Sequence, residues 1–191
     1  MKVGTDGVLL GAWAAVRPQD RRMLDIGTGT GLIALMLAQR APEAHVTGVD
    51  IDDVGQAREN AAASPWSGRV AFAQCPVQEF ETPEPFDLIV LRLLAPGGRF
   101  AVILPTAEAE RFLAVCAGRL ALVRRTDVRT TPRRPVKRAL MEFVRADRPA
   151  DRSADCSAAA PEVSELVVGT GEHECYTPEY RALTRDFYLK F

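Results

Sequence analysis

The chain has 191 residues, of which 47% are hydrophobic and 26% charged, as expected for one globular domain that can bury a sizeable core. Its 24 basic and 25 acidic residues leave a formal net charge of -1, which excludes a protein coated in positive charge but not a local basic patch. No apolar run approaches the ~20 residues that span a bilayer. The 4 cysteines form no CxxC pair and are accompanied by only 2 histidines, which argues against a zinc site. We therefore expect a cytoplasmic protein with reduced thiols, no metal and no membrane segment.

Apolar runs of strand length alternate with helical stretches along the chain. The pattern predicts strands at 23–26, 45–49, 69–73, 86–90, 100–104, 120–128 and 139–144, and helices at 32–40, 53–63, 107–119 and 179–189. Such alternation indicates an α/β fold, a doubly wound, mostly parallel seven-stranded sheet with helices on both faces and an antiparallel last strand. A loop is expected at 147–162. Thr177, followed by a proline and an acid, is a typical helix start.

A glycine-rich loop joins the first predicted strand to the first predicted helix. It runs from Asp25 to Gly31 and reads D-I-G-T-G-T-G. Glycines at such a turn let the backbone bend tightly and approach a ligand closely. The dinucleotide fingerprint would need a glycine at position 32, where this chain has leucine. A second acid, Asp50, ends the next strand, where doubly wound folds place a carboxylate that binds ribose hydroxyls.

The acid and the G-x-G-x-G spacing resemble the first motif of class I methyltransferases that use S-adenosylmethionine. The opening M-K-V-G-T-D-G-V-L-L-G-A-W and the ending Y-R-A-L-T-R-D-F-Y-L are similar to one branch, the bacterial valine-tRNA adenine-N6 methyltransferases. The resemblance implies that S-adenosylmethionine is the cofactor and that a helix begins at Thr5 beside its site. The simpler alternative is that Asp6 only caps that helix. The expected cofactor-binding residues are Thr5, Asp25, Gly27, Thr28, Gly29, Asp50, Ile51 and Val77.

The segment after the third strand departs from that family pattern. Such enzymes usually place an acid there, which binds the adenine amino group of the cofactor, whereas this chain reads Cys75-Pro76-Val77. Adenine would then be held by packing and by backbone groups such as the Val77 amide, since Pro76 has no amide hydrogen to donate.

The second departure concerns catalysis. Adenine-N6 methyltransferases carry the motif Asn-Pro-Pro-aromatic after the fourth strand. Hydrogen bonds from the amine to the Asn side chain and to a proline carbonyl draw the amine lone pair out of conjugation, and the aromatic ring stacks on the flipped base. Here the strand runs directly into L-R-L-L-A-P-G-G, which resembles the last turn of a helix and its stop. Only eight residues separate Val90 from Arg99, although parallel neighbours usually need a crossover of a dozen or more. We therefore expect a single methyltransferase domain over 1–191 in which the numbering closes over a catalytic segment that the protein has between Val90 and Leu91. Whether a further segment precedes Met1 is left open. The alternative is a real deletion that leaves an inactive fold.

A basic stretch runs from Arg124 to Arg138, and its default interpretation is a solvated hairpin. If the strand at 120–128 is parallel to the others, the loop after it lies at the carboxyl edge of the sheet, where ligands bind in open α/β sheets. Arg133, Arg134 and Lys137 are the expected RNA contacts.

The function predicted from all of this is S-adenosylmethionine-dependent methyl transfer to the N6 amine of an adenine in tRNA, by a monomer. No catalytic residue is predicted within the 191. Two alternatives stay open: a methyltransferase of the same fold acting on a protein amide or a small molecule, and a non-catalytic RNA-binding protein on a decayed methyltransferase fold.

Overall fold

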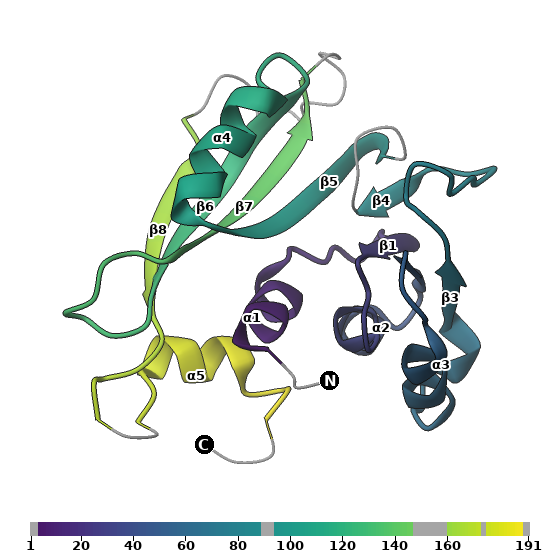
Figure 1. Ribbon diagram of the computed structural model, residues 1–191, viewed down its shortest axis with the longest axis horizontal. Helices are drawn as coiled ribbons and strands as arrows, with labels where there is room; N and C mark the ends of the chain where they lie inside the picture. Colours follow the sequence, from purple (N-terminus) through teal and green to yellow (C-terminus); the bar gives the residue numbers. More distant parts are fainter. Residues whose placement is uncertain (1–3, 89–93, 147–159, 173–174, 189–191) are drawn as a thin grey trace. The chain divides into compact units, whose positions relative to one another are not determined.

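The computed structural model describes residues 4–88, 94–146, 160–172 and 175–188 (Figure 1). The chain divides into two compact units, Met1–Phe100 and Ala101–Phe191. The expected interruption between Val90 and Leu91 lies outside the described residues. The single-domain assignment therefore stays a prediction.

The first unit is built on a parallel sheet. Its strands follow the order β3-β2-β1-β4-β5, and each neighbouring pair is parallel. The chain order of its elements is α1 (Thr5–Trp13), β1 (Arg22–Ile26), α2 (Leu32–Arg40), β2 (His45–Asp50), α3 (Gly55–Ala62), the 3-10 turn η1 (Ser67–Arg69), β3 (Val70–Gln74), β4 (Phe86–Leu88) and β5 (Leu94–Pro105). The carboxyl ends of β1, β2 and β3 therefore lie at one edge of the sheet.

Helix α2 forms over the predicted residues. Its apolar side chains extend to nearly every side because the sheet covers one side of the helix and α1 another. It packs on β1, β2 and β3 and also contacts α1. The two helices approach so closely that a Cβ added to Gly11 of α1 would lie 2.7 Å from the sulfur of Met36. One core of the unit, which includes Met23, Leu37 and Val46, lies on this face of the sheet.

The opposite face of the sheet carries Leu24, Val49 and Phe86, which pack against the loop after β3, including Val77 and Phe80. Residues 89–93 lie between β4 and β5, fewer than the dozen or more that a crossover between parallel neighbours normally takes. The loop after β3 thus supplies apolar cover to this face.

The second unit contains the end of β5, then α4 (Thr106–Cys116), β6 (Leu120–Arg129), β7 (Arg138–Arg145), β8 (Glu162–Val167) and α5 (Pro178–Thr184). Strands β6 and β7 form the predicted antiparallel pair, and β8 lies parallel to β6 on its other side. Phe112 of α4 packs edge-on against Phe143 of β7 at 5.6 Å between ring centres. The predicted start of α5 is confirmed, since the Thr177 hydroxyl accepts a hydrogen bond from the Tyr180 amide.

Several details differ from the sequence prediction. Helix α5 ends at Thr184, before the predicted end at 189. Strand β8 brings the described strands to eight; it is an edge strand with one fully buried residue, Leu166, so its hydrophobic pattern is weak. Residues 94–98 belong to β5 rather than to a helix end, with Gly97 at a φ of 73°, because they extend the strand that pairs with β4. The antiparallel strand is β7, which pairs with β6, and it is not the last strand in the chain. No helix in the part of the chain described here is long and apolar enough to cross a membrane.

Candidate cofactor site and family

The glycine loop connects β1 to α2 in a conformation that requires glycine. Gly27, Gly29 and Gly31 all have positive φ, at 68°, 54° and 78°, which L side chains rarely adopt. The amides of Gly27 and Thr28 both donate to the carbonyl of Val49 at the end of β2, at 2.9 and 3.1 Å. The loop is therefore fixed to the edge of the sheet.

Asp25 lies beneath this loop and holds it together. One oxygen of its carboxylate accepts hydrogen bonds from the Thr28 hydroxyl at 2.6 Å and from the Ala34 amide at 3.2 Å. The side chain is 3% exposed. Burial raises the pKa of Asp25 to about 6, a shift that the bonds from Thr28 and Ala34 oppose and the nearby Asp50 reinforces. Asp25 thus organises the loop from below, and a direct contact with a cofactor stays a prediction.

Asp50 bridges the loop and the end of β2. Its two carboxylate oxygens accept hydrogen bonds from the amides of Gly29 at 2.8 Å and Asp52 at 3.1 Å. Each carboxylate oxygen can accept a second hydrogen bond. The carboxylate therefore keeps the capacity to bind a diol.

A crevice of about 270 Å³ opens beside Asp50, at the carboxyl ends of β1, β2 and β3. Four of the predicted residues line it, namely Gly27, Asp50, Ile51 and Val77, together with Ile26, Val49, Cys75, Pro76 and Gln78. Its volume lies just below the ~300–1,000 Å³ typical of small-molecule sites, so it suits the nucleoside part of a cofactor. Ile51 is 68% exposed, which leaves an apolar surface that a flat ring can cover.

The other predicted residues lie outside this lining. Thr28 and Gly29 belong to the adjoining loop, and Asp25 lies in β1 beneath it. Thr5 is exposed in the first turn of α1. That helix has Gly4 at its N-cap and Asp6 as the acid of its first turn, so Asp6 is not the N-cap residue itself. Sequence reasoning missed Gln78, although its place after β3 was a usable signal.

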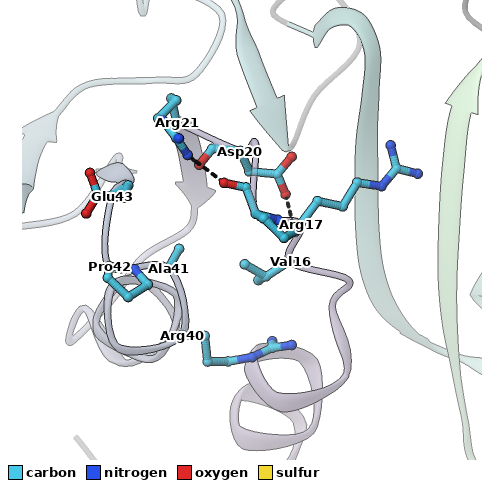
Figure 2. Close-up of a pocket in the computed structure, with 9 residues that line it drawn as sticks. Val16, Arg17, Asp20, Arg21, Arg40, Ala41, Pro42 and Glu43 are labelled. Carbon is cyan, nitrogen blue, oxygen red and sulfur yellow. Dashed lines mark hydrogen bonds between the residues drawn. The ribbon is translucent and has the colours of Figure 1, made fainter.

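A second cavity of about 270 Å³ lies near the start of β1 and the end of α2 (Figure 2). Its lining includes Arg17, Arg21 and Arg40, which suggests an anion site at first sight. However, Arg40 donates to the Gly11 carbonyl at 2.6 Å and Arg21 to the Pro18 carbonyl at 2.6 Å, while Arg17 points away from the cavity in Figure 2. The guanidinium groups of Arg40 and Arg21 therefore bind backbone carbonyls of helix α1 and of a turn, respectively.

The seven basic side chains from Arg124 to Arg138 differ in whether they form ion pairs. Three of them are ion-paired. Arg124 pairs with Glu142, and Arg129 pairs with Glu165. Arg125 pairs with both Glu110 and Asp127. The three predicted RNA contacts, Arg133, Arg134 and Lys137, are exposed in the turn between β6 and β7. In the described residues, no salt bridge engages those three side chains. The turn lies at the carboxyl end of β5, because the Thr106 amide donates to the Lys137 carbonyl at 3.2 Å.

Among the described residues, no group of three or more His, Cys, Asp or Glu side chains could hold a metal ion. The candidate site is thus a crevice with a carboxylate and an apolar rim.

Comparison with known proteins identifies the family. A family model described as a methyltransferase domain matches residues 23–121. A protein of Porphyromonas gingivalis named tRNA1(Val) (adenine(37)-N6)-methyltransferase is 39% identical, with 98% of this chain and 89% of the relative covered. The chain belongs to the tRNA1(Val) (adenine(37)-N6)-methyltransferase family. A relative of the same name from Musicola paradisiaca is 37% identical over 230 residues, covering 99% of this chain and 88% of the relative.

Solved structures confirm the fold of this family member. A predicted O-methyltransferase from Agrobacterium tumefaciens superposes with a TM-score of 0.72 at 16% identity, covering 95% of this chain and 96% of that one. The class I methyltransferase fold and the family predicted from the sequence are therefore both confirmed. Membership makes S-adenosylmethionine the methyl donor, as predicted.

The alignments with relatives are longer than this chain. The match to the Musicola paradisiaca protein spans 230 residues and that to the Porphyromonas gingivalis protein 236, whereas this chain has 191 residues. The first alignment therefore holds at least 39 positions, 230 less 191, that have no counterpart in this chain.

Proposed function

We propose that this protein binds S-adenosylmethionine in the crevice beside Asp50 and transfers its methyl group to the N6 amine of an adenine in a tRNA. The observation that carries the proposal is the joining of Asp50 to the glycine loop at the mouth of an open crevice, in a chain whose relatives are named for this reaction. A tRNA substrate also favours a cytoplasmic location.

The crevice has the chemistry that the nucleoside end of this cofactor requires. Asp50 offers a carboxylate to the ribose hydroxyls, and Ile51 and Val77 offer apolar cover to the adenine ring. The loop at Gly27, Thr28 and Gly29, supported by Asp25, would hold the methionine end. The bound cofactor supplies an electrophilic methyl group. The protein's task is to hold the amine in line with it, since positioning accounts for much of the rate of such a displacement.

We further propose that Arg133, Arg134 and Lys137 contact tRNA phosphates. The ion pairs of Arg124, Arg125 and Arg129 already hold those three guanidinium groups. The exposed trio at the turn provides positive charge that can bind phosphate without reading sequence.

The catalytic signature is absent from the printed sequence, which contains a single asparagine, Asn60. Its side-chain amide donates to the Thr30 carbonyl at 2.9 Å, so it supports the glycine loop. We propose that the residues with no counterpart in this chain include the segment expected between Val90 and Leu91. The short β4–β5 connection and the alignment gaps support this.

The absence of the signature also favours a second candidate function, a cofactor- and RNA-binding protein that does not transfer methyl groups. Action on a protein amide or small molecule has less support, because the relatives are named for a tRNA.

A methyl-transfer assay tests the proposal. The full-length protein, including the segment proposed between Val90 and Leu91, is incubated with an unmodified valine tRNA transcript and S-adenosylmethionine labelled in the methyl group, and the RNA is digested to nucleosides. The proposal expects labelled N6-methyladenosine. Binding of S-adenosylhomocysteine without methyl transfer would support the second candidate, and absence of both binding and transfer would contradict the two alike.

A further inference from the structure

The exit of β3 forms one wall of the crevice, and it carries no carboxylate. The residues there that line the crevice are Cys75, Pro76, Val77 and Gln78. Asp50 is the only charged side chain in the lining, and it lies at the end of the neighbouring strand, β2. An adenine ring at this wall must therefore be recognised by neutral groups.

Two neutral polar groups are available at that wall. The backbone amide of Val77 donates to no partner within the described residues, although the turn around it is fixed by bonds from Glu79 to Pro76 at 2.9 Å and from Phe80 to Val77 at 3.4 Å. The neighbouring Gln78 is exposed at the rim, and its amide carries both an acceptor oxygen and two donor hydrogens.

The edge of adenine presents a matching pair of groups. Its ring nitrogen N1 accepts a hydrogen bond, and its exocyclic N6 amine donates one. An amide hydrogen beside a carbonyl oxygen complements that pair, just as the amides of Asn and Gln complement the pair formed by the same amine and N7 on the other edge of adenine. The Val77 amide can serve N1 only, so the amine needs a separate acceptor.

We propose that Gln78 is the residue that recognises the 6-amino group of the cofactor's adenine, with its side-chain oxygen accepting from the amine while the Val77 amide donates to N1. This rests on the proposed cofactor site and names a specificity determinant within it. Because the acceptor is neutral, the contact is weaker than the charge-assisted bond that a carboxylate would make. Replacing Pro76 by aspartate should therefore strengthen cofactor binding.

Calorimetry with two ligands tests the inference. S-adenosylhomocysteine and its analogue with unsubstituted purine, which lacks the 6-amino group, are titrated into the wild-type protein, Gln78→Ala and the control Gln19→Ala. Gln19 is an exposed glutamine ahead of β1 that does not line the crevice. We expect Gln78→Ala to weaken S-adenosylhomocysteine by about two- to twelve-fold, the range of one net hydrogen bond, and to leave the analogue unchanged.

The ligand pair separates recognition from structural damage. Equal weakening of both ligands, or no effect of Gln78→Ala on either, would overturn the role of Gln78 while leaving the cofactor site intact. Failure of the wild-type protein to bind S-adenosylhomocysteine would instead overturn the cofactor site and this inference together. Pro76→Asp provides the complementary measurement, because it should tighten S-adenosylhomocysteine more than the analogue.

Discussion

The carboxylate of Asp50 accepts a hydrogen bond of 2.8 Å from the backbone amide of Gly29. This bond joins the end of β2 to the middle of the glycine loop, so the same side chain shapes the loop and faces the crevice. A single carboxylate thus serves both the organisation and the chemistry of the site.

Replacing Asp50 by alanine should therefore reduce cofactor affinity through two losses, the ribose contact and the ordered loop. Hydrogen bonds to charged groups contribute roughly 1.5–3 kcal/mol each, so calorimetry should show at least about a ten-fold weaker affinity for S-adenosylhomocysteine. Asp50→Asn keeps an oxygen for the Gly29 amide and should lose less. Wild-type affinity in Asp50→Ala would remove this residue from the site. The exposed Asp52→Ala serves as control, since that carboxylate lies outside the crevice lining.

Asp25 should make stability depend on pH in an unusual direction. Because its pKa is raised from 3.8 to about 6 on folding, the native state binds more protons than the unfolded state between those values. Its contribution to stability is fully present below about pH 3.8 and is lost as the pH rises through 6. Asp25→Asn keeps an acceptor for Thr28 and Ala34 without the buried charge. We expect it to raise the free energy of unfolding at pH 7 by about 1–3 kcal/mol.

Urea unfolding of wild type and Asp25→Asn at pH 4, 5, 6 and 7 checks this expectation. The difference between the two proteins should grow with pH over that series. A constant difference, or a wild type that gains stability relative to Asp25→Asn as the pH rises, would show that burial of the Asp25 carboxylate does not govern the trend.

Gly48 of β2 lies against Phe72 of β3 and Thr28 of the glycine loop, so a larger residue there would test how tightly these parts are packed. A Cβ at this position would lie 2.5 Å from the ring of Phe72 and 2.6 Å from the Thr28 hydroxyl oxygen. Gly48→Ala should therefore destabilise the protein by about 1–3 kcal/mol, the usual cost of overpacking, and weaken cofactor binding because Thr28 is displaced. Gly68→Ala is the matched control, since a Cβ there meets nothing within 4 Å. Thermal unfolding and calorimetry measure both effects, and equal behaviour of the two variants would contradict the packing argument.

The sequence predicted the parts of this structure whose physics is local. Helix α2 could be predicted because its run of apolar residues ends at Ala41-Pro42, and the glycine loop because three positive-φ positions need glycine. Strand β8 could not, since an edge strand with exposed Glu162 and Glu165 has little hydrophobic signal. The position of Asp25 beneath the loop could not be predicted either, because motif spacing does not distinguish a group that touches a ligand from one that holds the loop. Nor did spacing show which arginines of the basic stretch are ion-paired, since Glu142 and Glu165 are brought to them only by strand pairing.

That last distinction gives a test of the RNA contact. Arg133→Ala/Arg134→Ala removes two exposed charges from the turn, whereas Arg129→Gln removes one that is already paired with Glu165 at 2.8 Å. Each phosphate contact contributes about 0.9 to the slope of log affinity against log salt for a duplex and about 0.7 for a single strand. The double variant should bind valine tRNA more weakly and lower the slope by about 1.4–1.8, while Arg129→Gln should barely change it. Filter binding from 50 to 300 mM salt measures both quantities. An unchanged slope in the double variant, or an equal change in Arg129→Gln, would mean that tRNA binds elsewhere, because exposed charge at the turn is the property that sets these residues apart.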